Sequence, residues 1–289
     1  MPRKYNQKQC LGILREAVNT IVRYPCILFP FITVSFIQLL VMELFYFANR
    51  YPLVKFFGPV IENRWGEAYL HYPFNLIIVP KLFQYVQIPL YLFVGSFMVA
   101  LAIYMIYQIN ENHVVRLKTS IRELKSRYVY IVVAALSSLA VMYVLYSLYG
   151  TLMMRAWHIK SKSGIFYSLK TFVLYGEPYV NLLIGVMATT VFAFLLPILV
   201  VEKKKFFVAF ALNFKTLFHS WWSTFLIVLI PTLFYIPILL FKTNVAFVVN
   251  TSSPELWLWA VILSIPMMAL IDSVIYTALT LKYLILREN

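Results

Sequence analysis

The chain has little charge and almost no cysteine. Only 12% of its residues are charged, against about 25% in a typical soluble domain, and this excludes a soluble globular protein. Its two cysteines, Cys10 and Cys26, indicate neither a disulfide framework nor a zinc-binding cluster. No Ser-His-Asp spacing, phosphate-binding loop or carboxylate pair stands out. We therefore expect a protein that is not an enzyme and that holds no metal or cofactor.

Apolar residues dominate instead, at 62% of the chain with a mean hydropathy of +0.80. Crossing a hydrocarbon core of about 30 Å takes roughly 20 residues of helix. Six apolar runs reach that length, and they do not alternate as barrel strands do. The sequence predicts an all-α polytopic membrane protein with one transmembrane domain over residues 1–289. The expected spans are 25–48, 88–109, 128–149, 179–201, 221–241 and 256–281.

The lysines and arginines predict the orientation of these spans. The N-terminal segment, the connections after spans two and four, and the C-terminus together hold sixteen of the 25. The positive-inside rule then places both termini in the cytoplasm of a multi-pass protein, which we expect in a bacterial inner membrane. The net charge of +14 favours anionic lipid headgroups over nucleic acid as the partner. Candidate headgroup contacts are Lys203, Lys204, Lys205, Arg116, Arg122 and Arg127.

An amphipathic segment precedes each odd-numbered span. Each carries an apolar stripe with the spacing 3, 4, 3, which is one face of a helix. Such helices lie flat in the membrane interface. The sequence thus predicts three units of interfacial helix, span and span, over about 7–109, 110–201 and 202–289, as parallel repeats. The stripes are Leu11, Leu14, Val18 and Ile21; Val114, Leu117, Ile121 and Leu124; and Phe207, Phe210, Phe214 and Leu217.

The polar faces of these three segments differ. The first two carry charged side chains, whereas the third shows only Asn213, Thr216 and Ser220. On the opposite side of the membrane, the connection 49–87 holds short apolar pieces at 54–61 and 74–79. These pieces are too brief to span, so we expect them at the headgroups.

The fourth span closes with Leu-Pro-Ile-Leu-Val-Val-Glu at 196–202, before a segment containing Ala209 and Ala211. Together with the segments that lead into the odd spans, this resembles the six-span membrane domain attached to some bacterial glycerophosphodiester phosphodiesterases, and related stand-alone bacterial inner-membrane proteins. The resemblance covers nearly the whole chain. It implies a fold and a lipid setting, but no activity, because the phosphodiesterase domain has no counterpart here.

The polar residues within the spans leave two functions open. Asp272 lies sixteen residues after Leu256, at a depth where a bare carboxylate costs about 2.5 kcal/mol or more. Gln38 and Asn181 could line a cavity with it, and Glu43 lies near the end of its span. One hypothesis is a non-catalytic, lipid-contacting scaffold or accessory subunit that binds other membrane proteins. The other is a small transporter or flippase-like protein with a cavity around Asp272.

Overall fold

The computed structural model describes residues 10–158, 164–244 and 253–288, and within these ranges all regular structure is helical. Six of the described helices are long and apolar enough to cross a membrane. The expectation of an all-α polytopic membrane protein is therefore confirmed. The first nine residues lie outside the described ranges.

The six spans and the helices that connect them follow one another along the chain. Span one is η1 (Pro25–Leu28) with α2 (Phe29–Tyr46), and span two is α4 (Phe74–Leu90), a π turn η3 (Tyr91–Gly95) and α5 (Ser96–Asn110). Span three is α7 (Tyr128–Trp157), span four α9 (Glu177–Val191) with α10 (Leu195–Val201), span five the second half of α11 (Phe206–Leu233), and span six α14 (Pro254–Glu288). The remaining described helices are α1 (Cys10–Arg23), α3 (Val54–Trp65), η2 (Glu67–Leu70), α6 (Leu117–Lys125), α8 (Ile165–Tyr175) and α12 (Ile236–Thr243).

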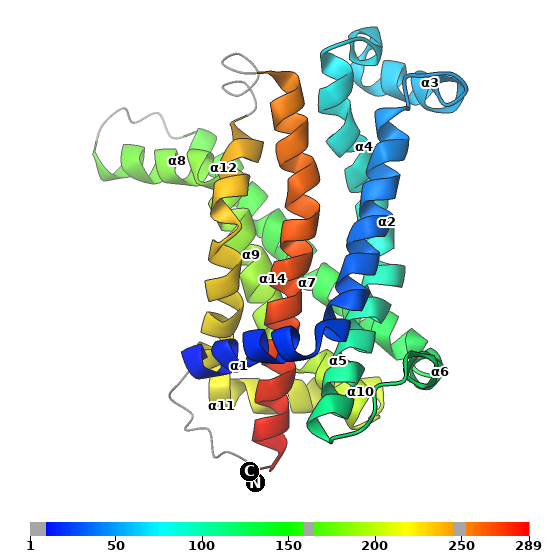
Figure 1. The fold of residues 1–289 in the computed structure, drawn as a ribbon. Coiled ribbons are helices and arrows are strands. Elements are labelled where there is room, and N and C mark those ends of the chain that lie inside the picture. Colours follow the sequence, from blue (N-terminus) through cyan, green and yellow to red (C-terminus); the bar gives the residue numbers. More distant parts are fainter. Residues whose placement is uncertain (1–9, 159–163, 245–252, 289) are drawn as a thin grey trace.

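Helix α14 runs through the middle of the bundle and packs against α1, α2, α5, α11 and α12 (Figure 1). The helices α1, α6 and the first half of α11 lie at one end, where α1 crosses α14. We call this the basic end. The opposite end carries α3 and α8, and we call it the cavity end for the reason given below.

Buried apolar residues form three clusters in the described structure, and the two larger ones are described here. The larger one joins α5, α10, α11 and α14 with the buried faces of α1 and α6. The smaller one lies at the cavity end, where the end of α2 meets α3, α4 and the start of α14; among its members are Met42, Ile61, Val79 and Leu258. The walls of the candidate site described below come from this smaller cluster.

Span two begins earlier than the sequence predicts. The expected start was residue 88, with 74–79 in a surface connection, but α4 begins at Phe74 and carries Pro80 and Pro89 in its interior. Membrane helices tolerate such prolines because neighbouring helices and local π or 3-10 turns satisfy the freed backbone groups. The π turn that begins at Tyr91 follows Pro89 directly. Residues 74–79 therefore belong to the helix of span two and not to a separate surface connection.

A helix precedes each odd span, as predicted, and the last residue of each predicted stripe is buried, namely Ile21, Leu124 and Leu217. The first stripe residues, Leu11 and Phe207, are 70% and 83% exposed, and they point away from the bundle. The fully buried position is instead the one just before the third stripe residue. It holds Ala17 in α1, Ser120 in α6 and Asn213 in α11. The prediction that Asn213 lies on the polar face of its segment was wrong. Its side chain is buried because its amide group forms hydrogen bonds with backbone groups at the break in span four.

Candidate functional site

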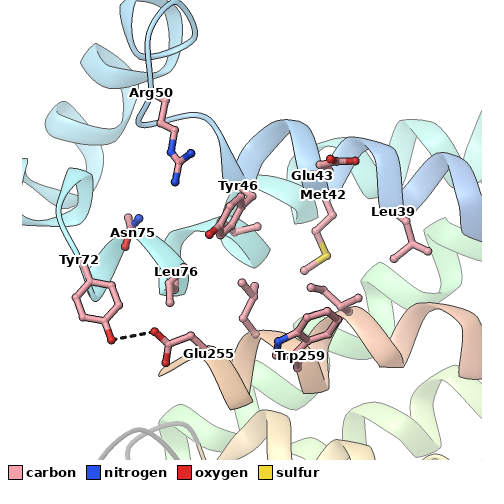
Figure 2. A pocket seen from close by; sticks show the side chains of 13 residues that line it. Leu39, Met42, Glu43, Tyr46, Arg50, Tyr72, Asn75, Leu76, Glu255 and Trp259 are labelled. Carbon is pink, nitrogen blue, oxygen red and sulfur yellow. Dashed lines mark hydrogen bonds between the residues drawn. The ribbon is translucent and has the colours of Figure 1, made fainter. Parts of the chain in front are cut away.

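A cavity of about 560 Å³ lies at the cavity end, between α2, α4 and α14 (Figure 2). Its walls are apolar side chains, and its rim carries one arginine, two carboxylates, an asparagine and two tyrosines. Pockets that hold small molecules measure roughly 300–1,000 Å³ and combine apolar walls with a few polar groups. The lining residues are Leu39, Met42, Glu43, Tyr46, Arg50, Tyr72, Asn75, Leu76, Val79, Glu255, Leu258, Trp259 and Ile262.

Helix ends place the polar groups at the rim. The chain leaves α2 after Tyr46 and reaches Arg50 in the following turn. Helix α4 begins at Phe74, which puts Asn75 in its first turn. Helix α14 begins at Pro254, and Glu255 in its first turn faces the positive end of the helix dipole. Three span ends thus deliver their polar residues to one opening.

The rim contacts leave several polar groups without an ionic partner. The hydroxyl of Tyr72 donates a hydrogen bond of 2.9 Å to Glu255 Oε1, and this bond raises the pKa of Tyr72. The guanidinium of Arg50 lies 5.9 Å and 5.2 Å from the ring centroids of Tyr46 and Phe47. Among the described residues, Arg50 has no carboxylate within 4 Å. Among the described residues, none donates a hydrogen bond to the buried Oδ1 of Asn75.

A second, smaller cavity lies within the bundle near Asp272. It measures about 60 Å³, is lined by Tyr91, Ser96 and Tyr276 among others, and has room for a few water molecules. Asp272 interacts electrostatically with both tyrosines. The π turn of span two supplies Tyr91, and the break in span four borders the same cavity through Phe192. Asp272 therefore lies close to two tyrosines that line this cavity.

The structure does not bring the predicted intramembrane polar residues together. Within the described ranges, no hydrogen bond joins Asp272, Gln38 or Asn181, and neither Gln38 nor Asn181 lines one of the two cavities. Glu43 does line the larger cavity. In Figure 2 it lies on α2 in the upper part of the view, away from Tyr72 and Glu255 in the lower left.

Of the six candidate headgroup contacts at the basic end, two bind protein groups. Lys203 Nζ donates a hydrogen bond of 2.8 Å to Glu123 Oε2, which lowers the pKa of Glu123 and raises that of Lys203. Arg127 Nη1 donates one of 3.2 Å to the carbonyl of Lys204. These contacts tie α6 to the turn between α10 and α11. The other four side chains are exposed, namely those of Lys204, Lys205, Arg116 and Arg122.

Among the polar residues that line the larger cavity, only Glu43 was predicted from the sequence. Tyr72 and Glu255 are separated by 183 residues, so no local pattern connects them. One signal was present in the sequence: Arg50, Asn75 and Glu255 are polar residues within a few positions of a span end. That signal is shared by many headgroup-facing residues, and only the three-dimensional arrangement singles these out.

Comparison with protein-family models, with curated proteins and with solved structures gave no match. The fold and the cavities define the class on their own. The chain is a six-span α-helical membrane protein with an amphipathic cavity at one end and a smaller polar cavity inside.

Proposed function

We propose that this protein is a non-catalytic membrane protein that binds one lipid or similar amphiphile in the larger cavity. The observation that supports this proposal is the cavity's division into apolar walls and a charged rim. Leu39 lies seven residues before the end of α2, which puts the deepest wall about 10 Å below the rim. A lipid would place its acyl chain against the walls and its headgroup at the rim.

The lipid-binding proposal agrees with the predicted orientation. By the positive-inside rule the basic end faces the cytoplasm, and the cavity then opens toward the outer leaflet. The resemblance to the phosphodiesterase membrane domain also implies a lipid setting. Within this proposal the exposed basic residues Arg116, Arg122, Lys204 and Lys205 contact anionic headgroups of the inner leaflet, and a scaffold role toward other membrane subunits remains a prediction.

Filling the cavity tests the proposal. We would purify the protein in mild detergent and measure bound phospholipid per chain by native mass spectrometry. Ile262→Trp puts an indole into the cavity that Ile262 lines. We expect this variant to retain at most one tenth of the phospholipid that the unaltered protein retains, because the indole occupies the acyl-chain space.

The neighbouring residue provides the matched control. Leu263 is 57% exposed and does not line the cavity. Leu263→Trp adds the same side chain to the outside of the same helix, and we expect it to keep its lipid. Equal lipid retention by the two variants, or no retained lipid in the unaltered protein, would refute the proposal.

The smaller cavity supports a second candidate, a proton- or ion-coupled transporter that uses Asp272. Transporters bind coupling ions where helices are interrupted, and here a π turn and a helix break border the cavity near the half-buried Asp272. A volume of about 60 Å³ admits an ion or water but no organic solute. The larger cavity would then hold the transported amphiphile.

An Asp272→Asn variant separates the two candidates. In liposomes with an imposed pH gradient, a coupled transporter should lose gradient-dependent movement of a fluorescent lipid between leaflets. A static lipid-binding protein should show no such movement in either form, and both forms should retain the lipid bound in the larger cavity. Gradient-dependent movement that survives Asp272→Asn would exclude Asp272 as the coupling group.

A further inference from the structure

The polar residues of span six lie mainly on one side of Asp272. Asp272 is close to the middle of α14, which runs from the cavity end to the basic end (Figure 1). Between Leu256 and Ile271, toward the cavity end, Ser264 is the only side chain with a hydroxyl or an ionisable group. Toward the basic end, a set of polar residues begins at Asp272 and continues to Tyr283. We call this set the polar row: Asp272, Ser273, Tyr276, Thr277, Thr280 and Tyr283.

We infer that Asp272 binds a proton and exchanges it with the basic end through the polar row. For its biological role this inference rests on the transporter candidate, and it adds two properties to that candidate. The coupling ion is a proton, and it enters and leaves at the basic end. Lipid bound in the larger cavity is not needed for this exchange.

The polar row follows one face of α14. Four of its members are spaced by four, four and three residues, which places them one above another along the helix, and the other two form the neighbouring line. The first line is Asp272, Tyr276, Thr280 and Tyr283, and the second is Ser273 and Thr277. Apart from Asp272 and Tyr276, which are half-buried, every member is at most 3% exposed. Polar residues that face the interior of a membrane bundle are typical of ion and proton pathways.

The smaller cavity lies at the Asp272 end of the row. Hydroxyl groups from five helical segments line it, namely those of Tyr91, Ser96, Ser138, Thr189 and Tyr276. Tyr91 and Tyr276 are the described titratable groups that interact electrostatically with Asp272, and no described cation lies within 4 Å of its carboxylate. Because a hydroxyl both donates and accepts hydrogen bonds, such neighbours can solvate the carboxyl group in either protonation state. Divalent cations take six or more oxygen ligands, many of them carboxylates, so this site suits a proton better.

Glu202 lies at the other end of the row. The hydroxyl of Tyr283 donates a hydrogen bond to Glu202 Oε1. Glu202 follows α10 directly and is half-buried beside three exposed lysines, so its carboxylate can take a proton from water at the basic end. Arg287 is the described cation that interacts with Tyr283. Lys282 points instead toward α11, where three oxygen atoms accept its hydrogen bonds.

The spacing of the row suits proton transfer. Neighbouring members of one line are three or four residues apart, which is about 5–6 Å along the helix axis, and one water molecule can bridge that distance. The hydroxyl of Thr277 is buried and has no hydrogen-bond partner among the described residues, so it is available for such a contact. Each hydroxyl accepts a proton on its oxygen and releases its own to the next group, so only the proton moves.

The rate of proton exchange at Asp272 tests the inference. After a rapid change of pH, infrared spectroscopy of the full-length protein in mild detergent follows the C=O stretch of protonated carboxyl groups. The band that Asp272→Asn removes belongs to Asp272. Thr277→Val and Tyr283→Phe each remove one hydroxyl of the polar row. We expect each to slow the change of this band about tenfold, because the loss of a hydrogen bond from the row raises the barrier to proton transfer.

Ser264→Ala is the matched control. It removes a buried hydroxyl from the same helix, on the cavity-end side of Asp272, and should leave the rate unchanged. Equal rates in the unaltered protein and all three variants, or equal slowing by all three, would overturn the inference. A carboxyl band that Asp272→Asn does not change at any pH would also overturn it. Unchanged size-exclusion profiles would confirm that the variants fold.

Failure of the inference and failure of the transporter candidate give different results. Row-dependent proton exchange at Asp272 without gradient-dependent lipid movement in liposomes would refute the transporter and leave the exchange pathway intact. Gradient-dependent movement that is lost in Asp272→Asn but unaffected by both row variants would keep the transporter and overturn the pathway. A band of Asp272 that responds to Na⁺ at constant pH would overturn the assignment of the proton as the coupling ion.

Discussion

The two ends of the bundle satisfy their polar groups in different ways. At the basic end, buried hydrogen bonds join the interfacial helices to the spans. Ser120 Oγ donates to Gln108 Oε1 at 3.1 Å, and Asn213 accepts from the Phe194 amide at 3.0 Å and donates to the Val191 carbonyl at 2.8 Å. At the cavity end Asn49 and Trp257 make part-buried bonds to backbone carbonyls, other polar side chains line an opening, and one buried oxygen, Asn75 Oδ1, has no donor in the described structure.

The positive side chains differ in the same sense. Five cations at the cavity end lie within 6 Å of aromatic ring centroids: Arg50, Lys55, Arg64, Lys81 and Lys242. At the basic end one described cation does so, Lys282, which lies 5.8 Å from the ring of Phe194. Of these five cations, Arg50 alone lines the larger cavity. The basic end is therefore closed by buried polar contacts, whereas the cavity end stays open.

The largest expected effect is at Asn213. Asn213→Leu removes the acceptor of the Phe194 amide and the donor to the Val191 carbonyl, and it leaves both backbone groups buried without partners. We expect a loss of about 3 kcal/mol in the free energy of unfolding, because each unsatisfied buried group costs roughly 1–3 kcal/mol. Chemical denaturation in detergent measures it. Lys215→Leu, on an exposed position of the same helix, is the control, and equal losses in both would contradict the role of Asn213.

A smaller effect is expected at Lys282, which is 4% exposed. Its Nζ donates to the Ser220 carbonyl at 3.2 Å, to Ser223 Oγ at 2.6 Å and to Thr224 Oγ1 at 2.7 Å, at the kink of α11. Lys282→Met should cost about 1.5 kcal/mol, the lower range for bonds to a charged group, because Ser223 and Thr224 still donate to the same carbonyl.

Unfolding of Lys282→Met would be measured beside Arg287→Met, an exposed cation in the same helix. A stabilised Lys282→Met protein would show that the cost of burying the cation exceeds the gain from its three bonds. The kink of α11 would then persist without the hydrogen bonds from Lys282.

At the cavity end the expected losses are smaller still. Arg64 lies 4.9 Å from the ring centroid of Tyr85 and connects α3 to α4. Arg64→Gln should lower stability by about 0.7 kcal/mol, which is typical of an exposed cation over a ring. A double-mutant cycle with Tyr85→Leu isolates the contact. A coupling as large as the Asn213 effect would break the distinction between the two ends.

The smallest effect is expected for the exposed ion pair of Glu123 and Lys203, at about 0.5 kcal/mol. Since Lys203 holds the pKa of Glu123 below its ordinary value, the contribution is complete above the ordinary carboxyl range and is lost as the pH falls through the lowered pKa. The stability difference between the unaltered protein and Glu123→Gln should therefore be present at pH 7 and vanish in acid and in high salt. A difference that grew on acidification would contradict this sign.

The sequence predicted the features that depend on interactions between residues near in the chain. The six spans follow from uninterrupted apolar runs, and the helices before the odd spans from apolar spacing. It failed at Phe74, because prolines in α4 resemble a boundary unless neighbouring helices are known to satisfy the backbone. It failed again at Asn213, because an asparagine near lysines and threonines gives no sign that a break nineteen residues earlier needs its amide.

The candidate site was less predictable than the fold. Glu43 was identified from its depth alone, whereas Tyr72 and Glu255 meet only after α4 and α14 have packed together. Asp272 was identified from its cost in hydrocarbon, but its neighbour Tyr91 comes from a π turn that no sequence pattern marked. Polar residues contributed by several distant segments produce a site that periodicity cannot detect.

The break in span four has a consequence for biogenesis. Residues 192–194 interrupt the helix, and the amide that satisfies them belongs to a segment translated later. A nascent chain that stops before Phe206 has nothing to cover this gap, so we expect span four to leave the translocon only together with α11. Cysteine-accessibility measurements at position 193 should find the gap open in chains truncated at 205 and protected in chains truncated at 235; equal protection would show that span four settles in the lipid alone.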